Sequence, residues 1–354
     1  MGRITRINPV EDSRWDSFVE NHPFGWIHQL SGWKTCLEKS FKHLKGYYFV
    51  RLDGAEKNIL AGLPVFYVKS WLTGKRLISI PFATLCDPLI SNSNDMALLF
   101  ESVLNLAQKY NVSYIQIRTN LSASLIDKEL FGISNNYKNH YISLDTEMDD
   151  LKMTFHRKTV RQSLNRATRS NLRIKMAENE SDLTIFYKLY GMSRKRNGLP
   201  FFPFIFFKTL WESFYPQKIK LIMAEIGGKV IAGVLYFTFK NRVSLEYAGW
   251  DRKYAKICPN HLLYWEAIKL AKNEGFEIFD FGRTSVSNLN LLDFKSRWGT
   301  KIVELSQFFY PARTAEKMDQ IDRSWKYRLM SGICKHTPNS FQQTIGRFCY
   351  RHLG

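Results

Sequence analysis

An acidic side chain interrupts an apolar strand in the second half of the chain. Asp280 stands among Ile278, Phe279 and Phe281, a pattern typical of a buried strand, and Gly282 follows. A carboxylate at a strand end that faces a cleft accepts a proton or orients an amine. The alternative is structural, with Asp280 only capping the turn at Gly282. The residues by themselves leave both interpretations open.

Several cationic and aromatic residues surround this strand in the sequence. Arg196 lies in a cationic loop bounded by Gly and Pro, and Arg283 follows Gly282; both suit an anionic group of a substrate. Trp250 and His261 flank the segment that leads into the next helix. Each of these four side chains is therefore a candidate for substrate binding, or else is solvated (the arginines) or packed (Trp250 and His261).

The elements that must position these residues are organised as two similar halves. Residues 58–67 resemble residues 229–238, and residues 106–117 resemble residues 270–281. Gly227-Gly228 separates two β-rich runs, which predicts a hairpin. A helix is expected after Pro259, with Asn260 as its N-cap and Leu263, Ala267, Ile268 and Ala271 as its buried stripe. Each half is therefore predicted to be a mixed sheet flanked by helices, the product of a tandem duplication.

The net charge is confined to the second half of the chain. The 354 residues carry 51 Lys and Arg against 32 Asp and Glu, a net charge of +19. Residues 1–150 hold 16 of each kind, so residues 151–354 hold 35 basic and 16 acidic side chains. With 45% hydrophobic and 15% aromatic residues the chain has ample material for a packed core, which excludes global disorder.

The densest cationic stretch, residues 152–175, is called here the basic segment. It has eight Lys or Arg and no carboxylate, and Met153, Val160, Leu164 and Ala167 recur at helical spacing. The pattern predicts one amphipathic helix whose outer face is a solvated surface or binds a polyanion: RNA, a lipid pyrophosphate or an anionic membrane. The candidate nucleic-acid contacts are Arg157, Lys158, Arg161, Arg166 and Arg169.

Other features limit the compartment and the class. No apolar stretch approaches the length of a membrane-spanning helix, and the N-terminus shows no signal peptide. The five cysteines are odd in number and widely spaced, so we expect no disulfide framework and no metal site. The cytoplasm is the expected location. The basic tail, with Trp325, Tyr327, Leu329 and Met330, is expected to lie on a membrane surface or to pack back on the body.

A set of motifs resembles one protein family. In chain order the main ones are Asn21-His22-Pro23, Arg194-Lys195-Arg196-Asn197-Gly198-Leu199-Pro200, Glu246-Tyr247-Ala248-Gly249-Trp250, Phe279-Asp280-Phe281-Gly282-Arg283-Thr284 and Phe294-Lys295-Ser296-Arg297-Trp298-Gly299. Together they look like the FemAB group of the GNAT acyltransferase superfamily, whose members pair two GNAT domains. The match spans roughly residues 9–311 of this sequence. Two positions depart from the pattern: Leu37 replaces a substrate-binding lysine, and residues 201–207 replace an arginine.

The resemblance implies a fold, an activity and site residues. The expected fold is α/β (α+β), with tandem GNAT-like domains at residues 1–147 and 148–312 and a basic tail at 313–354. The expected activity is transfer of an acyl or aminoacyl group to a primary amine of a cell-envelope precursor, a peptidoglycan or surface-polysaccharide intermediate. Lys295 maps beside the reacting centre with Phe294, and Tyr247 maps onto a substrate-contacting position. Lys295 suits an oxyanion or a phosphate, and Asp280 and Tyr247 complete the expected catalytic set.

The co-substrate implied by the resemblance is aminoacyl-tRNA or acyl-CoA, with no tightly bound cofactor. GNAT domains usually hold the CoA pyrophosphate on a glycine-rich loop, whereas residues 250–260 contain no glycine. This absence and the basic segment favour tRNA. The implied partners are an anionic envelope precursor, tRNA and the inner face of the plasma membrane. The alternative is a non-catalytic protein on a GNAT-like fold that binds nucleic acid or a membrane surface.

Overall fold

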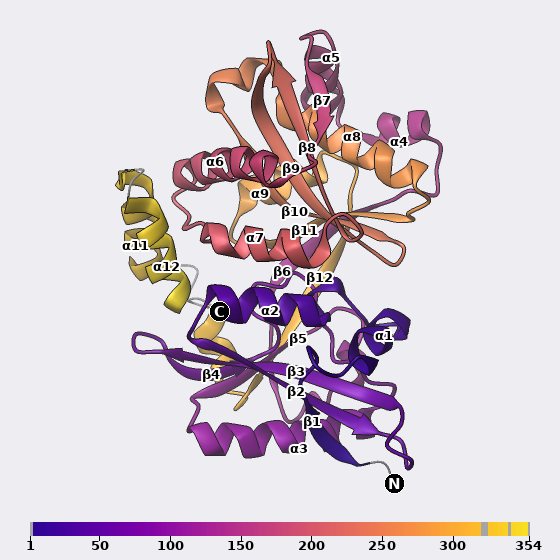
Figure 1. Cartoon of the computed structure of the whole chain (residues 1–354), viewed down its shortest axis with the longest axis vertical. Coiled ribbons are helices and arrows are strands. Elements are labelled where there is room, and N and C mark those ends of the chain that lie inside the picture. Colours follow the sequence, from indigo (N-terminus) through magenta and orange to yellow (C-terminus); the bar gives the residue numbers. More distant parts are fainter. Residues whose placement is uncertain (1–2, 320–324, 339–340, 353–354) are drawn as a thin grey trace. The chain divides into compact units, whose positions relative to one another are not determined.

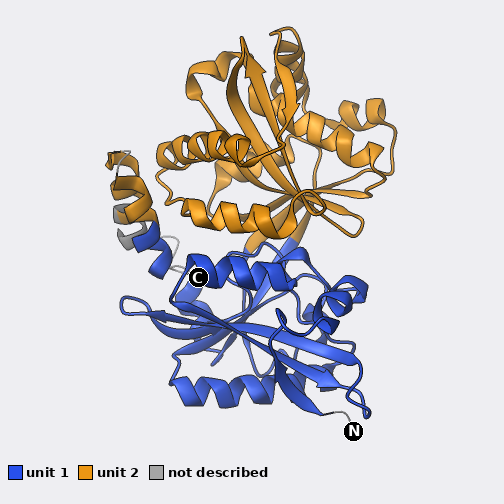
Figure 2. Cartoon of the chain, viewed as in Figure 1, with its two compact units in different colours: residues 1–136, 304–327, 347–354 blue, residues 137–303, 328–346 orange. Residues whose placement is uncertain are grey.

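The computed structural model describes residues 3–319, 325–338 and 341–352. They form two compact units, coloured in Figure 2: unit 1 is residues 1–136, 304–327 and 347–354, and unit 2 is residues 137–303 and 328–346. These limits differ from the sequence boundaries at 147/148 and 312/313. The reason is that strands β6 (Gly132–Ser143) and β12 (Lys301–Tyr310) each begin in one unit and end in the other.

Unit 1 is a mixed sheet with helices on both faces (Figure 1). Its strands pair in the order β1-β2-β3-β4-β5-β12, antiparallel except for the parallel pair β4–β5. Helix α3 packs on one face against Tyr47, while Trp15 of α1 meets Tyr48 on the opposite face, because neighbouring strand residues alternate in direction. The elements are β1 (Ile4–Ile7), α1 (Arg14–Asn21), η1 (Ile27–Gln29), α2 (Ser31–Ser40), β2 (Leu44–Leu52), β3 (Ile59–Ser70), β4 (Gly74–Ile78), α3 (Ser93–Tyr110), β5 (Tyr114–Arg118), η2 (Ala123–Leu125) and α10 (Thr314–Asp319).

Unit 2 repeats this arrangement. Its strands pair in the order β7-β8-β9-β10-β11-β6, antiparallel except for the parallel pair β10–β11. Helices α6 and α7 cover one face of the sheet, and α8 packs on the other. The elements are α4 (Met148–Thr154), η3 (Arg157–Arg161), α5 (Gln162–Thr168), β7 (Arg173–Met176), α6 (Glu180–Arg196), α7 (Phe204–Phe214), β8 (Ile219–Ile226), β9 (Lys229–Phe239), β10 (Arg242–Trp250), η4 (Arg252–Ile257), α8 (Pro259–Asn273), β11 (Ile278–Ser285) and α9 (Leu289–Ser296).

The predicted tandem duplication is confirmed by this shared topology. The segments that resemble each other in sequence fall on β3 and β9, and on the helix–strand pairs α3–β5 and α8–β11. The strand that follows each helix–strand pair along the chain completes the sheet of the other unit. Strand β6 follows β5 along the chain but closes the sheet of unit 2, and β12 follows β11 but closes the sheet of unit 1.

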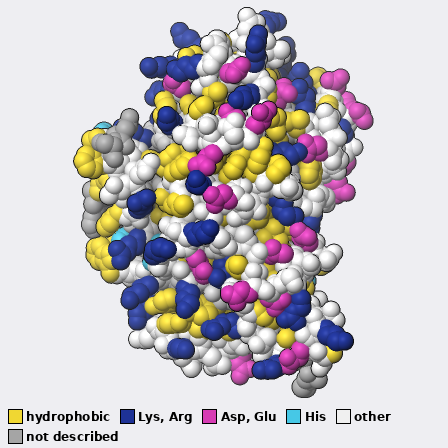
Figure 3. Space-filling view, viewed as in Figure 1, with side chains coloured by type: hydrophobic (Ala, Val, Ile, Leu, Met, Phe, Trp, Pro, Cys, Tyr) yellow, Lys and Arg dark blue, Asp and Glu magenta, His cyan; other side chains and the backbone are white. Residues whose placement is uncertain are grey.

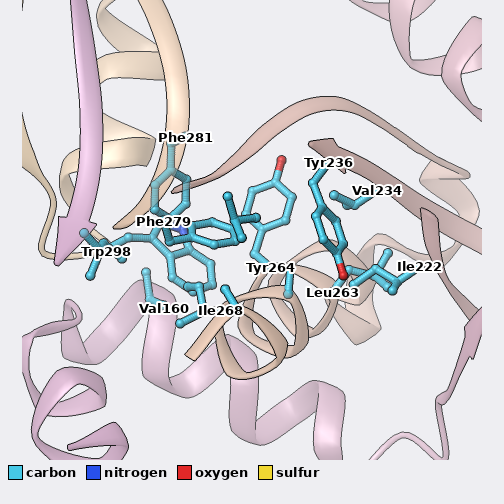
Figure 4. Close-up of a cluster of buried hydrophobic side chains, with 14 of the residues drawn as sticks. Val160, Ile222, Val234, Tyr236, Leu263, Tyr264, Ile268, Phe279, Phe281 and Trp298 are labelled. Atoms are coloured by element: carbon cyan, nitrogen blue, oxygen red, sulfur yellow. The ribbon is translucent and has the colours of Figure 1, made fainter. Parts of the chain in front are cut away.

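The core of unit 2 lies between the sheet and α8 (Figure 4). The predicted stripe of α8 is confirmed, since Leu263, Ala267, Ile268 and Ala271 are all buried. The predicted N-cap is wrong. The helix begins at Pro259, because proline fits the first helical position, so Asn260 lies inside the helix. The N-cap residue is Cys258, which has the left-handed backbone conformation.

The single helix predicted for the basic segment is also wrong. The segment comprises the end of α4, the π-helical turn η3, α5 and strand β7. The break falls at Phe155 and His156, because the buried Phe155 ring packs on Trp265 and Trp298. Val160, Leu164 and Ala167 are buried as predicted, but Met153, on the far side of the break, is 66% exposed.

The tail contains helices α11 (Trp325–His336) and α12 (Gln342–His352). The side chains of Trp325, Tyr327 and Leu329 lie outside the described residues. In α12, Tyr350 is buried against the rings of Phe41 and Phe82 in unit 1. This end of the tail therefore packs on the body, one of the two predicted outcomes. None of the helices in the described ranges combines the length and apolarity needed to cross a membrane.

Candidate active site

Lys295 is a buried lysine in the last turn of α9. Its side chain is only 6% exposed, and its ammonium donates to the backbone carbonyls of Gly282 at 2.7 Å and Arg283 at 3.3 Å. Burial lowers the pKa of Lys295 to about 8, against the raising effect of the Asp280 and Glu246 carboxylates. An ammonium has three N–H donors, so one is left beyond the two carbonyls. The geometry thus provides a fixed donor whose charge is held in a water-poor setting.

The carbonyls that hold Lys295 lie where two parallel strands part. Strands β10 and β11 pair only from Arg242↔Ile278 to Ser244↔Asp280, although both continue for several residues. Strand β11 also shifts register against β6 between Asp280 and Arg283. Gly282 sits in this irregular stretch with φ at +75°, a conformation that a Cβ would strain. Glycine here lets the backbone turn its carbonyl toward the ammonium.

Asp280 holds this irregular stretch in place. Its side chain is fully buried, and its oxygens accept from the Gly282 amide at 2.7 Å, from Asn139 at 3.0 Å and from Arg242 at 2.6 Å. The pair with Arg242 is a salt bridge in which the arginine is largely buried too. A carboxylate with three protein donors is anchored rather than mobile, so the geometry favours the structural interpretation of Asp280. A role in proton transfer stays a prediction.

Three residues near this lysine were missed by the sequence analysis. His140 of β6 is fully buried, and its Nδ1 lies 3.0 Å from the Thr300 hydroxyl, which in turn donates to the Lys295 carbonyl at 3.2 Å. Burial lowers the pKa of His140 to about 4, aided by the positive charge of Lys295, so its ring is neutral near pH 7. Glu246 is half-buried at the bulge of β10 and near enough to raise the pKa of Lys295. The signal that could have found it is an acid within an apolar strand.

Phe294, which precedes Lys295 in α9, packs with His261 in an aromatic cluster. The His261 ring lies 5.8 Å from Phe294 and is stacked at 5.8 Å on Trp298. Burial lowers the pKa of His261 to about 4, so it is a neutral packing group near pH 7. His261 thus packs against Phe294 and Trp298, while the adjacent Lys295 directs its ammonium to the carbonyls of Gly282 and Arg283.

Tyr247 faces the other side of the sheet. The register shift between Leu245 and Tyr247 turns its ring toward α6 and α7, where it lies edge-on at 5.1 Å from Phe207 and 5.9 Å from Tyr190. Two residues later, Gly249 allows helix α6 to pack closely on the strand, because a Cβ at this position would lie 2.3 Å from the Tyr190 nitrogen. The placement of Tyr247 is that of a core aromatic residue, and its catalytic role stays a prediction.

Arg196 and Trp250 form a second group within unit 2. The guanidinium lies 4.5 Å above the Trp250 ring and donates to the Ser193 hydroxyl at 3.1 Å. Burial, together with the charge of Arg252, lowers the pKa of Arg196. Arg196 borders a groove of about 1000 Å³ whose charged lining is mostly cationic. The charged residues in this lining are Lys188, Lys195, Arg196, Asp251, Arg252, Lys253 and Lys335.

Arg283, the remaining candidate for substrate binding, is half-buried. Its guanidinium lies 4.9 Å from the centre of the Tyr137 ring, while its carbonyl accepts from Lys295. The side chain is thus held by a cation–π contact. Arg283 links the lysine site to strand β6.

The basic segment presents most of its candidate contacts to solvent. Arg157, Lys158, Arg166 and Arg169 are exposed, while Arg161 is half-buried. Arg166 approaches the Cys258 sulfur at 4.0 Å, where α5 meets η4, so the exposed cations Arg252, Lys253 and Lys256 of η4 extend the same surface. Across the described part of the chain, no group of three or more His, Cys, Asp or Glu could hold a metal ion.

We expect Lys295 to give the chain a distinctive pH dependence of stability. Its pKa is about 8 in the folded chain against an ordinary 10.5, so between these values the unfolded chain binds more protons on this residue. Folding stability should therefore rise with pH in that window, by up to about 1.4 kcal/mol per pH unit. Urea unfolding at several pH values should show this rise in the wild type relative to Lys295→Met. The exposed matched control Lys301→Met should follow the wild type, and parallel curves for wild type and Lys295→Met would contradict the shift.

Comparisons with known proteins agree with this fold. A model of the "Acetyltransferase (GNAT) domain" matches residues 154–296, which end just past Lys295. The chain is 22% identical, over 85% of its length and 91% of the relative, to a "Lipid II:glycine glycyltransferase" of Staphylococcus epidermidis. In structure it is similar to FemX, with a TM-score of 0.69, 15% identity and coverage of 91% of this chain and 100% of that one. A "Tandem GNAT protein from the clavulanic acid biosynthesis pathway" gives a TM-score of 0.54 at 8% identity, covering 87% and 98%.

The GNAT domain matched at residues 154–296 and the glycyltransferase relative show an acyltransferase, and the doubled fold is that of a tandem GNAT protein. Over most of its length the chain is similar in sequence to a Fem-type glycyltransferase and in fold to FemX, which agrees with the resemblance that its motifs predicted. The predicted enzyme class is therefore confirmed over the alternative of a non-catalytic binding protein. An acyl or aminoacyl donor is its co-substrate.

Proposed function

We propose that this enzyme transfers an aminoacyl group from tRNA to a primary amine of a lipid-linked cell-envelope precursor. The observation that carries the proposal is the buried Lys295 ammonium, fixed by two carbonyls where β10 and β11 part. The glycyltransferase relative, whose name gives lipid II as its acceptor, supports this class of substrate.

In the proposed reaction, the amine nitrogen attacks the carbonyl carbon of the aminoacyl ester. A C–N bond forms, the carbonyl oxygen becomes negative, and the bond to the ribose oxygen then breaks as that oxygen takes up a proton. Lys295 donates its third N–H to the oxyanion. Such a donor acts best where water is excluded, and Lys295 is only 6% exposed.

The attacking amine must lose a proton, because a primary amine with a pKa of about 10 is mostly charged at neutral pH. We assign the acceptance of this proton to Glu246, whose carboxylate lies within electrostatic range of Lys295. To Asp280 we assign positioning, since its donors fix the stretch of β11 that holds the lysine.

Two features support tRNA rather than CoA as the donor. The link before α8 is the glycine-free turn η4, and the helix opens with Pro259, which has no N–H to offer a pyrophosphate. The exposed cations of the basic segment and η4 instead form a wide cationic surface of the kind that binds an RNA backbone.

The direct test is transfer from labelled donors. Purified enzyme is incubated with labelled aminoacyl-tRNA or labelled acyl-CoA, together with lipid-linked envelope precursors that carry a free amine. Label is expected in the acceptor from the tRNA donor. Incorporation from only the thioester would contradict the choice of donor, and no incorporation from either would contradict the proposed transfer.

Arg157→Gln with Lys158→Gln should weaken tRNA binding. Both side chains are exposed, so the double variant removes two phosphate contacts without disturbing the core, and it should reduce the slope of log affinity against log salt by about two. Filter binding across a salt series measures this slope. Lys208→Gln with Lys240→Gln removes equal charge from a half-buried and an exposed position elsewhere in unit 2 and should leave the slope unchanged. An unaltered slope in the first variant would place the RNA elsewhere.

A further inference from the structure

An exposed apolar tip stands at the turn between β3 and β4 in unit 1. Trp71 is 69% exposed and Leu72 is 54% exposed. Phe348 of α12 is 53% exposed, and its ring lies 6.4 Å from that of Trp71. Three large apolar side chains therefore gather in water, where each loses the stabilisation that burial would give.

Cations cluster beside this tip. Lys69 and Lys75 are directly opposite each other across the β3–β4 ladder, an arrangement of like charges that costs stability. A neighbouring hollow of about 770 Å³ is bordered by Trp71 and by six cations, and none of its described lining residues is a carboxylate. The six cations are Lys42, Lys45, Lys69, Lys75, Arg347 and Arg351. Figure 3 shows basic side chains beside hydrophobic ones on this unit.

The tip is held rigidly in this form. The Ser70 hydroxyl accepts from the amides of Leu72 and Thr73 and lies 2.8 Å from Nδ1 of His352. Arg76 donates to the Thr73 hydroxyl at 2.8 Å and to the His352 carbonyl at 3.2 Å. Helix α12 is thereby tied to the hairpin, so Trp71, Leu72 and Phe348 form one preformed surface.

We propose that this surface docks on an anionic phospholipid bilayer, with the apolar tip inserted at the headgroup boundary and the six cations on lipid phosphates. A bilayer satisfies both features, because its interface takes up Trp, Leu and Phe side chains while its anionic headgroups attract Lys and Arg. An RNA backbone would satisfy the charges but would leave Leu72 in water. The inference does not depend on the proposed transfer reaction, although docking here would bring the enzyme to a lipid-linked acceptor.

Vesicle flotation tests the proposal with the full-length protein. Vesicles of phosphatidylcholine alone are compared with vesicles that contain about one-third phosphatidylglycerol. Binding should be strong only to the anionic vesicles. Lys69→Gln with Lys75→Gln should weaken it about twenty-five-fold, since each basic residue near an anionic surface contributes about fivefold. Trp71→Ser should remove the part of the binding that persists at high salt.

Matched controls separate this surface from other exposed groups. Leu289→Ser changes a side chain that is 72% exposed in unit 2, and Arg157→Gln with Lys158→Gln removes the same charge from the basic segment. Both controls should float like the wild type.

Equal binding to neutral vesicles, or unchanged binding in the Lys69/Lys75 and Trp71 variants, would overturn the proposal. Loss of tRNA binding instead of vesicle binding in those variants would show an RNA surface and would equally overturn it. Transfer to a detergent-dispersed acceptor by the same variants reports separately on the proposed function.

Discussion

Replacing Lys295 with methionine is expected to lower kcat about a hundred- to a thousandfold, the usual effect of losing one donor to a developing oxyanion. The change removes the charge but keeps a long unbranched side chain in a site that is only 6% exposed. The KM for the acceptor should change little, because the interaction forms in the transition state. Steady-state kinetics with saturating donor measures both quantities.

The control for this loss is Lys301→Met, the same substitution at an exposed position of unit 2. It should keep wild-type kinetics and a wild-type Tm. A kcat for Lys295→Met within a fewfold of wild type would assign Lys295 a purely structural role, as a cation that satisfies the carbonyls of Gly282 and Arg283.

Replacing Arg242 with methionine is expected to reduce the free energy of unfolding by about 3–5 kcal/mol, the typical cost of breaking a buried ion pair from one side. The Asp280 carboxylate is fully buried and would keep only Asn139 and the Gly282 amide as donors. Urea denaturation measures the loss. Lys208→Met breaks the exposed pair with Glu180 in the same unit and should cost no more than about 1 kcal/mol. Equal losses in the two variants would contradict the buried pair.

Asp280→Asn then separates positioning from proton transfer. The carboxylate raises the pKa of Lys295, so its removal should shift the alkaline limb of the rate profile to lower pH and leave measurable transfer. Loss of transfer at every pH, with unchanged stability, would instead make Asp280 the proton acceptor. If Asp280 has only a structural role, Asp280→Asn should lower the free energy of unfolding and leave the pH profile of the rate unchanged.

The repeat, the class of fold and the charge distribution were all readable in the sequence. Periodicity carries this information because an element that packs on a core must place apolar residues on one face, as in Leu263, Ala267 and Ile268 of α8. Net charge is a sum over residues, so the excess of basic residues in 151–354 can be counted from the sequence alone. Local motifs also singled out Lys295 and Asp280, which the structure places at one irregular stretch of β11.

What only the tertiary structure decided is how distant segments complete that stretch. Asn139 and His140 come from β6, a strand exchanged into unit 2, and Asn139 reaches Asp280 from 141 positions away in the sequence. The helix break at Phe155 and the β-bulge before Tyr247 also depend on distant segments. In each case the regular helix or strand pairing is interrupted, because a large aromatic ring is buried against a neighbouring element. The local sequence pattern determines which residues are apolar enough to be buried. Contacts between segments far apart in the chain determine which partner buries or pairs with each of them.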